Sequence, residues 1–320
     1  MTDSDKKIVV LNYNSFEEMY NNAIFNLASG NDPTAFVFRG QGDSSWKLLP
    51  SALRSTKSGE STLQKFDNID PSADEKFRRV MREYRALYEF YQTANIEGLP
   101  VPDMQDFFYI DILKNQILPA AIVFRRLFGG KWLPQQFLHL ASLAQHYGVP
   151  TRLLDWSSDF TIALYFAVRD ACKRIYEAEE QDKKIDLVNT RFAVWGLNYA
   201  YFSISSQTSE SPIKLRFIRP IYKDNLFITA QKGLFTLEEM DIDSQEFVDS
   251  MPLEERIESL SLKEFGSLCG KPYLIKITLP YSESKKAFTF LQRWGYTLTR
   301  IMPSLSSVYE DIKERMLFAK

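Results

Sequence analysis

Apolar side chains recur at two different spacings along the chain, and the dominant spacing changes near its middle. Between residues 72 and 93, apolar and aromatic side chains return every three or four positions, which is the spacing of one helix face. The same spacing predicts helices over 134–147 and 161–180, and short apolar stretches predict strands over 7–13 and 35–38. Shorter helices are predicted from Ser15, which is a good N-cap, from Pro50–Ser51 and over 103–114. The first half is therefore expected to be mainly helical.

In the second half, short apolar stretches dominate. They predict strands over 191–197, 214–221, 226–231, 273–279 and 296–301, separated by helices near 253–264, 282–293 and 305–317. We therefore expect an α+β fold in which a helical first half packs on a mixed, largely antiparallel sheet formed mainly by the second half. No linker divides the chain, so residues 1–320 are predicted to form one domain, with surface loops at 56–74 and 178–190.

Composition excludes several classes of protein. The net charge of −2 gives no global field for nucleic acid or an anionic membrane, so any such binding needs a local patch. Two cysteines, Cys172 and Cys269, exclude a disulfide framework and a cysteine-based zinc site, and they favour a reducing, cytoplasmic compartment. No apolar run is long enough to span a membrane, so no membrane partner is expected. The motifs of P-loop, Rossmann, α/β-hydrolase and HExxH metal enzymes are absent, and no metal site is predicted.

A first candidate site is the stretch FRGQGDSSWKLLPSALR, residues 38–54. Arg39 follows an apolar strand and precedes Gly40, Gln41 and Gly42. A guanidinium at a strand end, beside glycines that let a ligand approach, suits a phosphate or carboxylate ligand. The alternative is structural, because strand-end arginines often anchor a loop to a buried carboxylate. The pattern leaves both interpretations open.

A second candidate is AQHYGVPTRLLDW, residues 144–156, which holds one of only two histidines in the chain. The preceding pattern predicts a helix that ends at Gly148 in a left-handed cap. His146 would then lie in the last turn, where the helix dipole favours its cation, either as a proton donor or phosphate contact or as a cap of the helix carbonyls. Arg152 and Asp155 are expected to pair, because burial of either charge nearly requires a partner. Ser157 or Ser158 is expected to cap the next helix.

Two further stretches carry polar candidates. In TAQKGLFTLEE, residues 229–239, a strand bearing Gln231 runs into Lys232–Gly233 and then Thr236, so the side chains could read a ribose or an amide, or only form a hairpin turn. The stretch 214–223 mixes basic and aromatic residues, as single-stranded nucleic-acid grooves do. On a strand, however, this mixture favours a solvated face opposite the apolar one over a nucleic-acid groove.

Taken together and in this order, these blocks resemble the FRG domain family of bacterial and phage proteins. The resemblance rests on FRGQ (38–41) with W-x-L-x-PS-x-x-R (46–54), on AQHYGVPTRLLDWS with ALYFAV (163–168), and on AQKGLFT and RIMPSL (300–305), and it covers residues 35–317. Two departures are NLFITA, where a basic residue is expected, and MPSL, where an acidic residue is expected. Members are associated with mobile elements and defence, so the resemblance implies a role in bacterial or phage conflict.

The leading hypothesis is an effector directed at a nucleotide or NAD, similar to ADP-ribosyltransferases, with NAD as the candidate substrate. Its predicted catalytic residues are His146, Asp155 and Gln231, and its predicted ligand-binding residues are Arg39, Gln41, Arg152 and Thr236. Such chemistry needs a carboxylate, and the sequence leaves Asp155, Glu238, Glu239 and Glu283 open. One alternative is a sensor without activity that binds a nucleotide, nucleic acid or a phage or host protein. Another is a structural partner in a larger defence complex.

Overall fold

The computed structural model describes residues 7–24, 35–56, 58–67, 74–104, 129–207, 211–219, 229–245, 247, 250–260 and 272–318. Within these ranges, no helix combines the length and the hydropathy that a membrane span requires.

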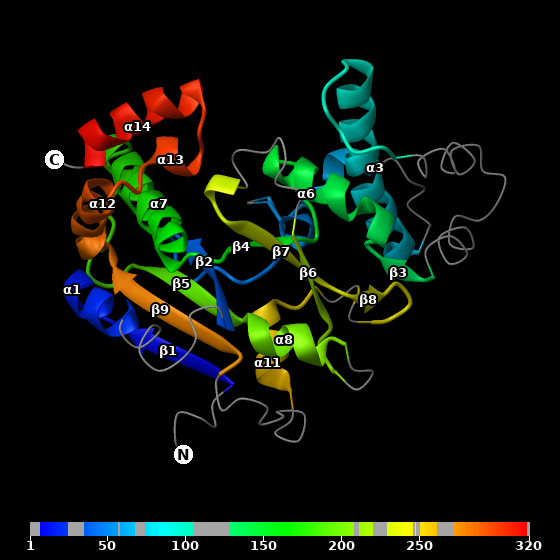
Figure 1. The fold of residues 1–320 in the computed structure, drawn as a ribbon, viewed down its shortest axis with the longest axis horizontal. Coiled ribbons are helices and arrows are strands. Elements are labelled where there is room, and N and C mark those ends of the chain that lie inside the picture. Colours follow the sequence, from blue (N-terminus) through cyan, green and yellow to red (C-terminus); the bar gives the residue numbers. More distant parts are fainter. Residues whose placement is uncertain are drawn as a thin grey trace.

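A seven-stranded sheet forms the centre of the molecule (Figure 1). Its strands are β1 (Ile8–Asn12), β2 (Phe36–Gln41), β4 (Leu154–Ser157), β5 (Arg191–Asn198), β6 (Leu215–Ile218), β7 (Gly233–Glu238) and β9 (Leu274–Pro280). They lie in the order β1-β9-β5-β2-β4-β7-β6, and only β1 and β9 run parallel. A separate two-stranded sheet joins β3 (Lys131–Trp132) to β8 (Met240–Asp241). The predicted mixed, largely antiparallel sheet is confirmed.

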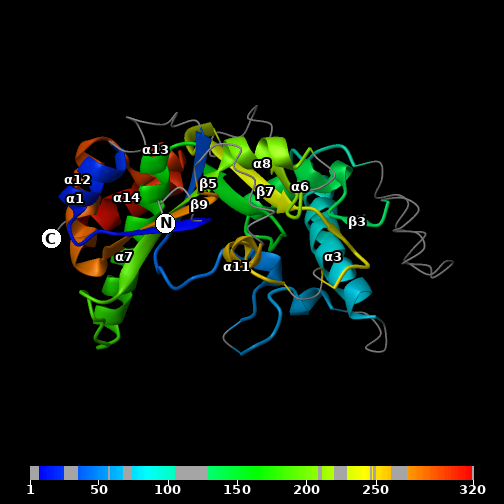
Figure 2. The same ribbon diagram turned by 90° about the horizontal axis from the view of Figure 1, so that it is seen from below.

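Helices surround this sheet. They are α1 (Phe16–Met19), α3 (Glu75–Ile96), α6 (Leu138–His146), α7 (Phe160–Glu180), α8 (Tyr199–Ser205), α11 (Leu253–Ser259), α12 (Ser284–Arg293), α13 (Leu298–Ile301) and α14 (Leu305–Phe318). A π-helical turn, Tyr20–Ile24, continues α1, and single 3₁₀ turns occur at Ser51–Leu53, Gln64–Phe66, Gln135–Phe137 and Tyr281–Glu283. Figures 1 and 2 place α12, α13 and α14 at one end of the molecule and α3 and α6 at the other.

Alternation along β2 divides the core into two layers. Phe36 and Phe38 face α7 and join a cluster that includes α12 and α14, whereas Val37 points to the opposite face, where α8 and α11 pack. Gly40 lies on the α7 side, and a Cβ built on it would approach the Ala163 carbonyl oxygen to 1.9 Å. The absence of a side chain at Gly40 therefore lets α7 lie directly on the strand. A third cluster joins α3 and α6.

The α+β prediction is confirmed, and most of the predicted helices and strands are present. Ser15 caps α1, accepting a hydrogen bond from the Glu18 N–H at 3.2 Å. Gly148 has a φ of +91°, as a left-handed cap requires. Three of the seven sheet strands, β1, β2 and β4, come from the first half, so the helical character of that half is only approximate.

Other local predictions are wrong. Residues 296–301 are not a strand, because Thr297 accepts a hydrogen bond from the Arg300 N–H and starts α13. In the predicted strand 226–231, the described part, from Thr229, is helical and then turns before β7 begins. The cap of α7 is Asp159 rather than Ser157 or Ser158. Of the predicted helix 103–114, all but the first two residues lie outside the described ranges.

Candidate functional site

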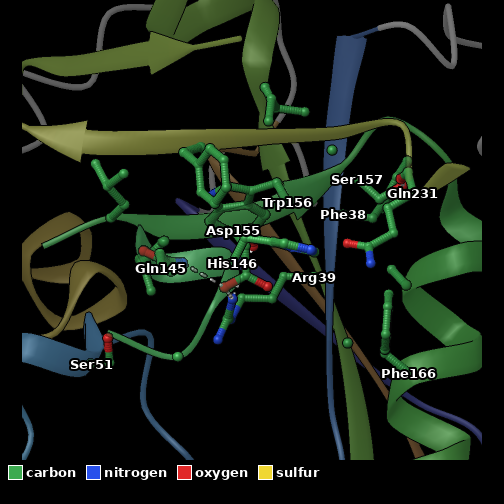
Figure 3. A pocket seen from close by; sticks show the side chains of 18 of the residues that line it. Phe38, Arg39, Ser51, Gln145, His146, Asp155, Trp156, Ser157, Phe166 and Gln231 are labelled. Carbon is green, nitrogen blue, oxygen red and sulfur yellow. Dashed lines mark hydrogen bonds and ion pairs between the residues drawn. The ribbon is translucent and has the colours of Figure 1, made fainter. Parts of the chain in front are cut away.

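The central sheet opens between β2 and β4. Strand β2 pairs with β5 along its whole length, Phe36 to Gln41, but with β4 only where Phe38 faces Ser157. Beyond that position a cleft of about 380 Å³ separates the strands. Four predicted site residues line it: Arg39 from β2, His146 from the end of α6, Asp155 from β4 and Gln231 from the turn before β7 (Figure 3). Residues up to 192 positions apart in sequence thus meet in one cleft.

Arg39 and Asp155 form the polar centre of this cleft. The Arg39 Nη1 donates to the Asp155 carboxylate and also to the Asp155 carbonyl oxygen at 2.9 Å. The guanidinium side chain is only 13% exposed, whereas the Asp155 side chain is 63% exposed. Desolvation alone would raise the pKa of Asp155, but the charge and hydrogen bond of Arg39 outweigh it and hold the pKa below its usual value. An ionised carboxylate is therefore presented to the cleft at neutral pH.

The protein does not use every donor of the Arg39 guanidinium. Its Nε is buried and has no hydrogen-bond partner among the described residues. A buried donor without a partner is uncommon in a folded protein, because its desolvation is not compensated. This Nε is enclosed by the protein, so a phosphate or carboxylate in the cleft would meet the positive charge of the guanidinium rather than the Nε–H group.

The end of α6 places two side chains beside Asp155. Gln145 donates from Nε2 to the Asp155 carboxylate at 3.4 Å and accepts from the Thr151 hydroxyl. His146 is half-buried at the cleft wall, and this burial lowers its pKa below the usual value. This shift in the pKa of His146 is opposite to the shift that a helix dipole produces, and the neutral imidazole dominates at neutral pH.

Gln231 is held at the other side of the cleft by its backbone. The Ser157 hydroxyl donates to the Gln231 carbonyl at 2.8 Å, and Lys232, at a φ of +47°, donates from Nζ to Asp159 at 2.9 Å. These bonds fix the turn to β4 and to the start of α7, so the Gln231 side chain reaches the cleft (Figure 3). Sequence reasoning placed Gln231 at the end of a strand, whereas it lies in the turn before one.

Aromatic side chains and a second guanidinium complete the lining. Phe38, Phe166 and Phe235 contribute apolar surface. Arg54 also lines the cleft, and its Nε donates to the Leu49 carbonyl at 2.8 Å. Desolvation and the nearby Arg39 charge lower the pKa of Arg54. Arg54 was not predicted as a site residue, although the PS-x-x-R motif ends on it and could have indicated it.

Arg152 does not join this cleft, and the predicted Arg152–Asp155 pair is wrong. The Arg152 Nε donates to Glu83 of α3 at 2.6 Å, and both residues are 5% exposed. The same carboxyl group accepts from the Trp132 indole N–H at 2.8 Å, and the guanidinium lies 3.9 Å from the centre of the Phe247 ring. This buried cluster joins α3 and β3 to the segment between α6 and β4, so Arg152 has a structural role.

Thr236 and Gln41 also bond inside the protein rather than in this cleft. The buried Thr236 hydroxyl accepts from the Trp156 indole N–H at 2.9 Å. The buried Gln41 accepts from the Trp195 indole N–H at 2.9 Å and donates to the Lys47 carbonyl at 3.3 Å. These bonds hold both side chains in the core, although Gln41 also lines the adjoining hollow beside Gly42 and Trp46.

The geometry distinguishes among the candidate carboxylates. Glu238 pairs with Arg256, Glu239 pairs with Arg216, and Glu283 accepts from the Phe16 N–H at 2.9 Å. Asp155 is the one of the four that lines the cleft. No group of three or more His, Cys, Asp or Glu side chains suited to a metal ion occurs in the part of the chain that the structure describes.

Comparison with known protein families identifies a domain in this chain. The model of the FRG domain matches residues 126–175, a range that includes α6, β4 and the first three quarters of α7. No curated protein and no solved structure matches the chain. The matched range contributes His146 and Asp155 to the cleft, and the chain carries an FRG domain.

Proposed function

We propose that the cleft between β2 and β4 binds a nucleotide, with NAD as its substrate, and that the protein transfers or hydrolyses the ADP-ribose group. One observation carries the proposal: an exposed, ionised carboxylate, Asp155, is bonded to a partly buried guanidinium, Arg39, and both line the same cleft. This combination suits a ligand that carries both phosphate oxygens and a centre that becomes positively charged during reaction.

The phosphates would contact Arg39 and Arg54, whose guanidinium groups line the same cleft. Phe38 and Phe166 offer apolar surface for a planar ring. Gln231, with a donor and an acceptor, and the neutral His146 suit the hydroxyl and amide groups of a nucleoside. The cleft volume of about 380 Å³ lies in the ordinary range for small-molecule sites.

In the proposed reaction, the N-glycosidic bond breaks and nicotinamide leaves as a neutral molecule with the bonding electron pair. The ribose carbon C1′ then carries positive charge, which the Asp155 carboxylate stabilises because Arg39 keeps it ionised. Water or another nucleophile forms the new bond to C1′ and loses a proton. No electron transfer is required.

The test is release of nicotinamide from NAD by the purified chain, with Asp155→Asn as the principal variant. We expect nicotinamide release to fall by about 100-fold or more, since the variant loses transition-state charge stabilisation. Its NAD affinity should change little. Glu17→Gln is the matched control, because Glu17 is an equally exposed, ion-paired carboxylate that lies outside the cleft. Equal activity of Asp155→Asn and the wild-type chain would refute the assignment.

A second variant tests the phosphate contact. Arg39→Gln should weaken NAD binding by about 10- to 100-fold, the loss of one charge-assisted hydrogen bond. If the wild-type chain binds NAD in an Arg39-dependent way but releases no nicotinamide, the cleft is a sensor site rather than an active site. We also propose the role in bacterial or phage conflict that the family resemblance implies. Phage infection of cells that express either the wild-type chain or the Asp155→Asn variant tests this role.

A further inference from the structure

The cleft continues into a second lobe on the other side of Arg39 and Asp155. This lobe has a volume of about 520 Å³ and shares Arg39, Gly40, Arg54, Asp155 and Phe166 with the first. Its own lining includes Trp46, Lys47, Arg169 and Asp170. A ligand group held at Arg39 and Asp155 is therefore open to a second molecule from the direction of Trp46 and Asp170.

Asp170 of α7 lines this lobe with a carboxylate that no described residue binds. A Cβ built on Gly42 would lie 2.0 Å from the Asp170 Oδ2, so a side chain at position 42 would displace the carboxylate from its present position. Asp170 has no hydrogen bond or ion pair among the described residues, although charged groups surround it. Arg169 pairs with Glu314 and Arg174 pairs with Asp43 at 3.0 Å, while Lys173, Glu177 and Tyr281 lie within electrostatic range.

Burial raises the pKa of Asp170 above its usual value, and the neighbouring cations offset only part of this effect. A carboxylate with a raised pKa is a stronger base than an ordinary aspartate. Asp155 differs in this respect, because Arg39 lowers its pKa. Two carboxylates that line one lobe are thus shifted in opposite directions, a pattern that suits a stabiliser of positive charge and an acceptor of protons.

The remaining lining indicates what kind of molecule enters. Trp46 is 42% exposed, and the Arg174 guanidinium lies 5.1 Å from the centre of its ring. Of the cations that line the lobe, Arg39, Lys47 and Arg169 pair with Asp155, Glu255 and Glu314. Arg54 has no ion pair among the described residues, so its guanidinium is left to bind an anionic strand. An exposed aromatic ring beside cations is the arrangement on which single-stranded nucleic acids stack their bases.

We propose that the second lobe holds a base of single-stranded nucleic acid as the acceptor of the ADP-ribose group, stacked on Trp46, and that Asp170 removes its proton. The inference rests on the proposed function. In the step, an N–H group of the base attacks C1′, the bond from C1′ to nicotinamide breaks, and neutral nicotinamide leaves with the electron pair. The proton of the attacking N–H passes to the Asp170 carboxylate, and Asp170 later returns it to water.

Binding is tested without NAD, by anisotropy of a fluorescent single-stranded oligonucleotide. Trp46→Ala should weaken binding by about 5- to 100-fold, the range for loss of one stacked base. Trp46→Phe should restore most of the affinity, because it retains an aromatic face. Binding by Trp46→Ala equal to that of the wild-type chain would overturn the inference.

Catalysis is tested with NAD labelled in the adenosine moiety and the same oligonucleotide. Asp170→Asn should reduce transfer to the oligonucleotide by about 100-fold or more while hydrolysis of NAD by water changes far less. Glu179→Gln, a variant of an exposed carboxylate on the same helix that does not influence Asp170, should transfer normally. As the pH is lowered, the rate of transfer should begin to fall at a higher pH than an ordinary aspartate would cause. This fall in rate on the acid side should be absent from Asp170→Asn.

The outcomes separate this inference from the proposed function. If the wild-type chain releases nicotinamide but labels no nucleic acid, or labels proteins instead, the acceptor assignment is overturned and the proposed function stands. Normal transfer by Asp170→Asn overturns the role of Asp170. If no nicotinamide is released at all, the proposed function and the catalytic step both fail, and Trp46-dependent oligonucleotide binding alone decides whether the lobe binds nucleic acid.

Discussion

Replacement of Arg152 by methionine should destabilise the protein strongly without touching the cleft. Methionine has a comparable length but no charge, so Glu83 would remain at 5% exposure with the Trp132 indole N–H as its remaining donor in this cluster. Removal of one partner from a buried ion pair typically costs about 3–5 kcal/mol, because the other charge stays buried without compensation. The loss of the 3.9 Å contact between the guanidinium and Phe247 acts in the same direction.

Urea unfolding followed by tryptophan fluorescence measures this effect. With a dependence of about 3 kcal/mol per molar urea, the midpoint should fall by about 1 to 1.7 M. The double variant Glu83→Gln/Arg152→Met should recover much of the loss, since it removes the uncompensated charge and retains an oxygen for Trp132. A change below about 1 kcal/mol in Arg152→Met, or a marked loss of NAD affinity in the folded variant, would refute a purely structural role for Arg152.

Three further predictions concern the core and its ionisable groups. Gly40→Ala should cost several kcal/mol and lower the thermal midpoint, because its Cβ would meet the backbone of α7 at Ala163; an unchanged midpoint would contradict the close approach. Burial raises the pKa of Cys172 to about 12, so native Cys172 should resist iodoacetamide at pH 8 and react once urea unfolds the chain, as peptide mass spectrometry can show. Burial also raises the pKa of Glu254, so its protonated form favours folding and this contribution is lost as the pH rises from about 4.5 through the folded pKa. In urea titrations, the free energy of unfolding of Glu254→Gln should therefore rise relative to that of the wild-type chain as the pH increases over that range. A difference in stability that stays constant with pH would argue against a raised pKa of Glu254.

Local features of the fold were largely predictable, because they depend on residues close in sequence. The period of α3 and the Ser15 cap follow from the spacing of residues within one or two helical turns. The segment 296–301 was mispredicted because its alternating apolar residues suit a strand, whereas the Thr297 hydroxyl stabilises a helix start at α13. A capping bond of this kind outweighed the strand propensity of so short a segment.

Partners distant in sequence could not be assigned. A buried Arg152 does have an opposite charge as its partner, as expected, but that partner, Glu83, lies on α3, 69 residues away in the sequence. The nearest carboxylate along the chain, Asp155, pairs with Arg39 instead. The convergence of Arg39, His146, Asp155 and Gln231 depends on strand order, which brings β2 and β4 together across more than a hundred residues. Sequence patterns supplied the candidates, and only the topology separated cleft residues from core residues.

The single pairing position between β2 and β4 has a mechanical consequence. It divides the sheet into two sub-sheets, β1-β9-β5-β2 and β4-β7-β6, which pair with each other at this position alone among the described residues. Arg39 belongs to one sub-sheet and Asp155 to the other, so their hydrogen bond and ion pair hold the two sub-sheets together. A ligand that binds both residues would reduce the motion of the two sub-sheets relative to each other. Amide hydrogen exchange in β4 should therefore slow when a ligand fills the cleft.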